Sequence, residues 1–260
     1  MIRPNSDWGG GQMTQLILGF DVGGSSVKAG AVDVKAGTLV GDLISAPTPE
    51  ASDPNHLMDV LAGLFARLPG GASRVGVAFP SVVKRGQVRT AANINSAWLG
   101  TNGAELVAQS LSRPAVFLND ADAAGIAEMR WGAGRGVKGS VVMLTFGTGI
   151  GTALFIEGRL FPNTELGHLE LRGMDAEKWA SAHVRTLLHL DWPAWVERVN
   201  DYLARLQAYL WPDLFIIGGG VSEHFAEFAP LLRAEAEIRP AHFFGEAGVI
   251  GAALAAGDAC

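Results

Sequence analysis

Cysteine is almost absent from this sequence. The chain of 260 residues contains a single cysteine, Cys260, at its last position. A disulfide framework needs paired cysteines, and structural zinc is usually held by several clustered thiolates, so the sequence excludes the first and predicts no structural zinc. A chain without disulfides is typical of a reducing compartment, and we expect a cytoplasmic protein.

Long apolar runs and an excess of basic charge are also lacking. The apolar run near the C-terminus, AGVIGAALAAG, is too short to span a bilayer, and residues 1–15 have no apolar stretch typical of a secretory signal. The glycine-rich, polar composition of residues 1–15 predicts a disordered lead-in. The net charge of −6 disfavours a general nucleic-acid binder. We therefore expect neither a membrane nor a nucleic acid as a partner.

Apolar periodicity predicts an α/β fold. Helical spacing or capping residues indicate helices at 53–68, 120–134 and 192–210, and a further helix after Gly218–Gly220. β-type runs indicate strands at 16–22, 27–34, 37–45, 74–79, 114–119 and 213–217, with two more within 139–158. Each half of the chain thus holds a hairpin turned by glycines, which favours a duplicated architecture over a simple doubly wound sheet.

Glycine-rich turns carry the first functional signal. They read DVGGSSVK, FGTGIGT and IGGGVS. Glycine lets backbone N–H groups approach an anion without a Cβ in the way, so these turns suit phosphate, although each alone is also an ordinary turn or helix cap. The hydroxyls of Ser25, Ser26, Thr145 and Thr148 can donate to phosphate, and Asp21 can hold Mg²⁺ through water.

Two polar stretches are candidates for chemistry. Asn119 and Asp120 follow a buried strand and open a helix, which is where α/β folds bind ligands, or where a plain helix cap would lie. The stretch 163–181 holds His168 among carboxylates. From the residues alone it is a metal site, a sugar site or a solvated loop.

Five motifs, taken in order, resemble one family. LGFDVGGSSVKAGAVD, LNDADAAGIAE, LTFGTGIGTAL, ELGH and IIGGGVS are similar in order and spacing to the ROK sugar kinases of the actin-like ATPase superfamily. The resemblance covers residues 16–256 and implies two ribonuclease-H-like lobes with a cleft between them. Residues 16–118 would form the smaller lobe, completed by a C-terminal helix at about 245–258, and residues 119–244 the larger one. RTAANINSAWLGTN and LTFGTGIGTALFIEGRLFPNTELGHLE resemble most the polyphosphate glucokinases of that family.

The resemblance implies the role of each candidate residue. Asp120 would accept the proton of the sugar's 6-hydroxyl as it attacks the terminal phosphoryl group, with Mg²⁺ as cofactor. The sugar-binding residues would be Asn119, Asp120, Glu165, His168, Glu177, Thr90 and Asn93, with Pro80 nearby. The phosphate-binding residues would be Asp21, Gly23, Gly24, Ser25, Ser26, Lys28, Gly147, Thr148, Gly149 and Gly151. Gly218, Gly219 and Gly220 would hold the nucleotide or the distal donor.

The family's zinc ligands are missing from this chain. Most ROK kinases follow the histidine with a cysteine-rich run, and GMDAEKWAS stands in its place here, with Glu177 where a sugar-binding glutamate is expected. The stretch around His168 thus resembles a sugar site without its metal. Asp122 is expected to stabilise the first turn of its helix and is assigned no chemistry.

Glucose and inorganic polyphosphate, ATP, or both are the implied substrates. Lys84, Arg85 and Arg89 are ordinarily a solvated turn, or they form with Lys28, Arg130, Arg135 and Lys138 a basic track for a long polyanion. An ATP-dependent glucokinase or a kinase of another hexose such as mannose is the alternative. A transcriptional repressor would need a helix-turn-helix ahead of residue 16, and the sequence there has neither the length nor the pattern. A non-catalytic sugar sensor would not need Asp120. The family and the apolar helix stripe around Trp195 suggest a homodimer.

Overall fold

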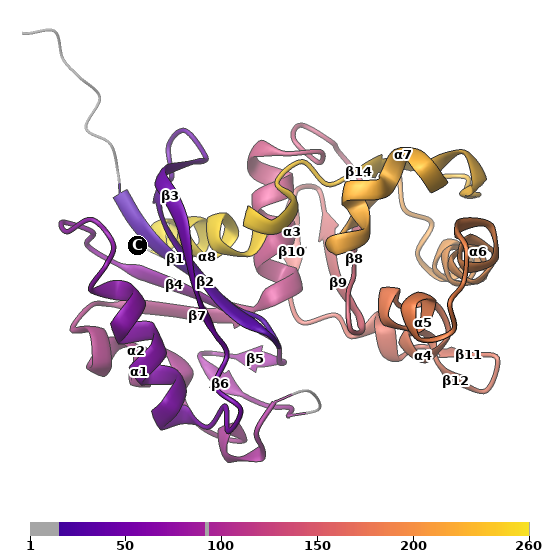
Figure 1. Cartoon of the computed structure of the whole chain (residues 1–260). Helices are drawn as coiled ribbons and strands as arrows, with labels where there is room; N and C mark the ends of the chain where they lie inside the picture. Colours follow the sequence, from indigo (N-terminus) through magenta and orange to yellow (C-terminus); the bar gives the residue numbers. More distant parts are fainter. Residues whose placement is uncertain (1–15, 92–93, 260) are drawn as a thin grey trace, which may run out of the picture.

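The computed structural model describes residues 16–91 and 94–259, which form two β-sheets with helices between and around them (Figure 1). The first sheet has the strand order β3-β2-β1-β4-β7. Its strands are β1 (Leu16–Val22), β2 (Ser26–Asp33), β3 (Thr38–Pro47), β4 (Val75–Phe79) and β7 (Ala115–Asn119). β1, β2 and β3 pair antiparallel, whereas β4 and β7 continue from β1 in parallel.

The second sheet repeats the plan of the first. Its order is β10-β9-β8-β13-β14, from β8 (Ser140–Phe146), β9 (Ile150–Ile156), β10 (Arg159–Phe161), β13 (Leu214–Gly218) and β14 (Glu237–Pro240). Again the first three strands in the chain pair antiparallel and the last two pair parallel. The duplicated architecture expected from the glycine-turned hairpins is therefore confirmed, while the lobe boundaries proposed from sequence stay a prediction.

Two helices lie between the sheets. α8 (Ala247–Asp258) packs on β1 and β4 of the first sheet, and α3 (Asp120–Trp131) packs on α8 and on β8 and β9 of the second. Glycine makes this packing possible, because a Cβ on Gly251 would lie 1.6 Å from the carbonyl oxygen of Ala123 in α3. A Cβ on Gly76 of β4 would likewise lie 1.8 Å from the carbonyl oxygen of Ala252. The small residues of the C-terminal run thus serve a close helix contact.

The outer helices cover the sheets with their apolar faces. α1 (Pro54–Phe65) and α2 (Gly103–Leu111) bury Leu57, Leu61 and Val107 in the core of the first lobe. α4 (Ala176–Ala180), α5 (Ala182–Leu187), α6 (Trp192–Leu210) and α7 (Phe225–Phe228) belong to the second lobe. Short 3₁₀ helices are η1 (Ser96–Trp98), η2 (Leu166–His168), η3 (Gly220–His224), η4 (Ala229–Leu231) and η5 (Phe244–Glu246). Two-stranded pairs are β5 (Val83–Lys84) with β6 (Gln87–Val88), and β11 (Glu170–Leu171) with β12 (Met174–Asp175).

Several elements differ from the sequence-based expectation. The helix expected at 53–68 ends at Phe65, and the one expected at 120–134 ends at Trp131, where Gly132 caps it. The helix expected after Gly218–Gly220 is only a 3₁₀ turn followed by the single turn α7. The lead-in at residues 1–15 lies outside the described residues.

The apolar stripe of α6 has a different role from the one expected. Trp195, Val199, Tyr202 and Leu206 are at most 1% exposed and form the core of their own lobe. The stripe is therefore not a surface for a second subunit, and the argument for a homodimer that used it was wrong. In the parts of the chain that the structure describes, no helix combines the length and hydrophobicity needed to cross a membrane.

Candidate active site

Asp120 lies at the point where the two lobes meet. β7 ends at Asn119, and Asp120 is the first residue of α3. The helix cap is Asn119, whose Oδ1 accepts the backbone N–H of Asp122 at 3.0 Å. The Asp120 carboxylate accepts only the neighbouring N–H of Ala121, at 2.8 Å, among the described hydrogen bonds. From the sequence, either residue of the pair could cap the helix. In the structure Asn119 is the cap, and Asp120 faces the cavity between the lobes.

Burial and neighbouring charges set the acidity of Asp120. Burial is the main cause that raises its pKa to about 7, and the carboxylates of Asp21 and Glu165 raise it further. The N–H of Ala121 acts in the opposite direction. A carboxyl with a pKa near neutrality is suited to general base catalysis, because it is ionised at working pH and still basic enough to take a proton.

The cavity next to Asp120 has a volume of about 280 Å³ and draws its walls from both lobes. Asp21 and Lys28 come from the hairpin β1–β2, and Thr145 comes from β8. Other walls are glycines at and after the end of β13, residues of η5 and the start of α8, namely Gly218, Gly219, Gly220, Phe244, Gly245, Ala247 and Gly248. The Lys28 Nζ donates to the Gly245 carbonyl at 3.1 Å and so stands at the junction of the lobes. A cation and glycine backbone in one polar cavity suit phosphate groups.

Asp21 is a candidate for holding a divalent cation in this cavity. Burial raises the pKa of its carboxyl, and the charge of Lys28 opposes that effect. Its carboxylate lies against α8, where a Cβ on Gly248 would come within 2.6–2.9 Å of the three carboxyl atoms. An oxygen ligand held in a cavity fits Mg²⁺, which prefers carboxylate and water oxygens.

The predicted phosphate turns lie around this cavity rather than in its walls. Gly23, Gly24, Ser25 and Ser26 form the tight turn of β1–β2, and Thr48 donates to the Gly23 carbonyl at 2.6 Å. Gly147 and Thr148 form the exposed turn of β8–β9. Of the ten predicted phosphate-binding residues, the structure places Asp21 and Lys28 in the cavity wall.

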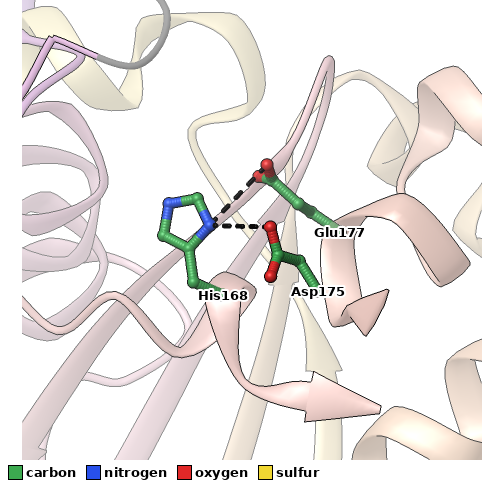
Figure 2. A group of neighbouring side chains, drawn as sticks. All are labelled: His168, Asp175 and Glu177. Atoms are coloured by element: carbon green, nitrogen blue, oxygen red, sulfur yellow. Dashed lines mark ion pairs between the residues drawn. The ribbon is translucent and has the colours of Figure 1, made fainter. Parts of the chain in front are cut away.

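Sugar-binding candidates gather on the other lobe near Asp120. The Nε2 of His168 lies 3.5 Å from Glu165. Its Nδ1 lies 3.7 Å from Asp175 and 3.8 Å from Glu177 (Figure 2). Burial raises the pKa of Glu165, with a smaller contribution from Glu177 and an opposing one from His168. Glu177 lies at the start of α4, and its Oε2 accepts the N–H of Ile150 at 3.4 Å. Such acceptors around one imidazole suit a polyol.

Sequence reasoning missed Asp175, although it lies within the stretch that was singled out. Its carboxylate pairs with the Lys178 ammonium at 3.2 Å, and that hydrogen bond holds its pKa below the usual value. His168, Asp175 and Glu177 offer ligand atoms within 4.8 Å of one another, the kind of group that holds a metal ion. Two features disfavour zinc here: the Lys178 ammonium pairs with Asp175, and the sequence has no cysteine near His168. The absence of structural zinc stays a prediction.

The first lobe contributes a loop that is hydrogen-bonded to Asn119. The Nδ2 of Asn119 donates to the Ser81 carbonyl at 3.2 Å, and the Ser81 hydroxyl donates to the Thr90 carbonyl at 2.7 Å. Thr90 is exposed, and its Oγ1 accepts the N–H of Val82. Asn93 lies outside the described residues. The structure thus links Thr90 to Asn119 through Ser81, and the sugar-binding role of Asn93 stays a prediction.

The seven cations of the expected basic track do not form one wall. Lys28 lines the cavity, while Lys84 and Arg85 lie on the exposed β5–β6 turn and are not among the residues described as lining it. Arg130 pairs with Asp258 at 3.5 Å, and Arg135 stacks over Trp131. Lys28 is therefore the one of these seven cations that lines the cavity.

Comparison with known proteins agrees with this geometry. The model of the ROK family matches residues 17–180. The chain belongs to the ROK family. It is 44% identical over 239 residues to a polyphosphate glucokinase of Mycobacterium tuberculosis, covering 92% of this chain and 90% of that one. It is also 41% identical over 253 residues to the polyphosphate glucokinase of Mycobacterium leprae, covering 97% of this chain and 78% of the other.

Solved structures of ROK proteins share the fold. The inorganic polyphosphate/ATP-glucomannokinase of Arthrobacter sp. strain KM has a TM-score of 0.89 and 42% identity, over 92% of this chain and 97% of that one. A ROK family glucokinase of Streptomyces griseus, solved with glucose and AMPPNP, has a TM-score of 0.79 at 23% identity, over 93% and 99% of the two chains. The two-lobed actin-like architecture expected from the sequence is therefore confirmed.

Proposed function

We propose that this protein phosphorylates glucose on its 6-hydroxyl with inorganic polyphosphate as donor, and that ATP serves as a second donor. The observation that carries the proposal is the place of Asp120, between the donor cavity of Asp21 and Lys28 and the polar cluster of Glu165 and His168. The identity of 44% to a polyphosphate glucokinase over most of both chains supports the choice of sugar and donor.

Asp120 acts as the general base. Its carboxylate takes the proton of the 6-hydroxyl while that oxygen attacks the terminal phosphorus of the donor. The bond from this phosphorus to its bridging oxygen breaks, and shortened polyphosphate, or ADP when ATP is the donor, leaves. Phosphoryl transfer needs little other chemistry from a protein, because alignment and charge neutralisation supply most of the rate enhancement. Asn119, Glu165, His168, Glu177, Thr90 and Asn93 hold the sugar, and hydrogen bonds to several hydroxyls discriminate among hexoses.

Donor phosphates are held from both lobes. Lys28 supplies a cation, and the turns with Gly23, Gly24, Gly147 and Gly149 let the backbone approach the donor because no Cβ is in the way. The N–H groups of Gly23 and Gly147 donate within their own turns, to the carbonyls of Ser26 and Gly149. Ser25, Ser26, Thr148 and Gly151 extend the same surface. Asp21 would hold Mg²⁺ through water, and the ion would supply positive charge against the donor phosphates. Gly218, Gly219 and Gly220 contact the distal part of the donor, which is the nucleotide of ATP or the next units of polyphosphate.

A side-by-side assay tests the function. Purified enzyme with Mg²⁺ is given glucose and either nucleotide-free polyphosphate or ATP, and glucose 6-phosphate is measured with a coupled dehydrogenase. We expect product with both donors and a higher kcat/KM with polyphosphate. Turnover with ATP alone would refute the polyphosphate donor and leave an ATP-dependent glucokinase.

The sugar and the oligomer are tested in the same preparation. Mannose is the second candidate substrate, because the Arthrobacter relative at 42% identity is named a glucomannokinase. Exposed Tyr209 and Trp211, at 62% and 69%, give an apolar surface for the homodimer that we propose. Size-exclusion chromatography with light scattering measures the molar mass of the protein in solution. The mass of a monomer at assay concentration would contradict the dimer.

A further inference from the structure

The side chain of Asn163 joins the two lobes beside the sugar candidates. Asn163 lies between β10 and η2, two residues before Glu165. Its Oδ1 accepts the backbone N–H of Val83 at 2.7 Å, and its Nδ2 donates to the carbonyl of the same residue at 2.9 Å. These two hydrogen bonds, named here the Asn163–Val83 clasp, tie the β5 strand of the first lobe to a loop of the second.

Asp122 holds the backbone of Asn163 in place. Its Oδ2 accepts the N–H of Asn163 at 2.8 Å, and its own N–H is bound by the Oδ1 of Asn119 at 3.0 Å. The hydrogen bonds therefore run without a break from Asn119, next to the catalytic base, through Asp122 to the clasp.

The environment of Asp122 is costly for a carboxyl group. The residue is 2% exposed, and no described residue forms a hydrogen bond with its Oδ1. Burial raises its pKa to about 7, with the charge of Glu165 adding to this effect and the N–H of Asn163 opposing it. A buried polar atom without a partner destabilises a fold, so its presence beside a reactive centre calls for a functional reason.

We infer that Asp122 and Asn163 are positioning residues that hold the sugar-binding groups of the two lobes in register with Asp120. The inference rests on the proposed function. Thr90 reaches the site from the first lobe and Glu165 from the second, so their separation depends on how the lobes lie relative to each other. The clasp fixes that relation close to both, because Val82, next to Val83, donates to Thr90, and Asn163 is two residues before Glu165. Sugar-binding groups that are displaced make poorer hydrogen bonds and bind glucose more weakly.

Glycine at position 163 removes the clasp with little disturbance of the backbone. Asn163 has a φ of 59°, which glycine adopts without strain, so Asn163→Gly deletes both side-chain hydrogen bonds and keeps the turn. From two neutral hydrogen bonds we expect kcat/KM for glucose to fall about 5- to 100-fold, mainly through a higher KM for glucose. The KM for the donor should change less than about twofold, because that cavity does not involve the clasp.

A matched control separates this effect from a general loss of turn stability. Glu157 is exposed, has a φ of 51° and lies in the β9–β10 turn of the same lobe. Glu157→Gly should leave the KM for glucose unchanged. An unchanged KM for glucose in Asn163→Gly, or equal increases for glucose and donor, would overturn the inference.

Substitution of Asp122 tests the other half of the proposal. Asp122→Ala removes the acceptor of the Asn163 N–H and should raise the KM for glucose. Asp122→Asn retains an acceptor oxygen, so its KM for glucose should stay close to that of the wild type. In the double variant Asp122→Ala/Asn163→Gly the loss should not exceed that of the worse single variant, since both act through the clasp. If the losses of the two single variants add up fully in the double variant, Asp122 and Asn163 do not act through the same clasp. If Asp122→Ala does not fold, Asn163→Gly alone decides. A wild-type enzyme that does not phosphorylate glucose would refute the proposed function before any variant is made.

Discussion

Substitution of Asp120 by asparagine should lower activity and raise stability at the same time. Asparagine has the same shape and cannot accept the hydroxyl proton, so turnover should fall by about two to four orders of magnitude, the usual contribution of a general base. The helix should remain capped, because the cap is the side chain of Asn119. The gain in stability has a separate cause: the variant no longer has to bury a charged carboxylate.

The sign of the stability change follows from the pKa of Asp120. Its folded-state value of about 7 lies above the unfolded value, so the folded state binds the proton more tightly and stability falls as pH rises between the two values. The cost of ionisation is about 1.5 kcal/mol at pH 5 and about 4 kcal/mol at pH 8, from a shift of about 3 pKa units. Asp120→Asn escapes this cost, so its advantage over wild type should grow by about 2.5 kcal/mol over that range.

Denaturant unfolding of both proteins at the two pH values measures this difference. The other titrating groups, among them Asp122, are common to both chains and largely cancel in the comparison. Activity of the wild type should rise with pH through about 7, as the base loses its proton, and the variant should lack that rise. A variant with near-normal turnover, or one whose advantage in free energy of unfolding is the same at pH 5 and pH 8, would refute the reasoning.

Three further predictions concern metal and donor. Elemental analysis of protein purified without a histidine tag should find no stoichiometric zinc, because Lys178 pairs with Asp175 and thiolates are lacking near His168; about one zinc per chain would show that His168, Asp175 and Glu177 do bind an ion. Added salt should raise the KM for polyphosphate more strongly than the KM for ATP, since a longer polyanion releases more counterions on binding, and equal salt effects on the two KM values would contradict a basic path. Lys28→Ala should lower kcat/KM about 10- to 100-fold with both donors through the loss of a charge-assisted contact, whereas alanine at Lys84, Arg85 and Arg89 together should impair only long polyphosphate. Equal loss with both donors in the triple variant would place those cations at the terminal phosphates.

Most of the local structure around the site could be predicted from the sequence. Asp53 caps α1 as expected, α6 has the predicted bounds Trp192–Leu210, and Asp120 opens a helix after a buried strand. These features depend on side-chain periodicity and capping within a few residues. The helix expected after Gly220 did not form beyond one turn, because a 3₁₀ turn occupies its start and Pro230 follows shortly after its end.

The residue types of the site and their order could be read from the sequence, since glycine turns, the Asn119–Asp120 pair and the stretch around His168 are each local in the chain. Which of them share an environment depends on the fold. Asp122 follows Asp120 by two residues, about 200° around the helix, and its carboxylate finds Asn163 of the second lobe as its partner. Asp175 reaches His168 through the short β11–β12 pair. Burial and the charges of Asp21 and Glu165 raise the pKa of Asp120, and those neighbours are distant in the chain. Acidity and hydrogen bonding depend on neighbours in space, and the packing of α3 between the two lobes is what brings these groups together.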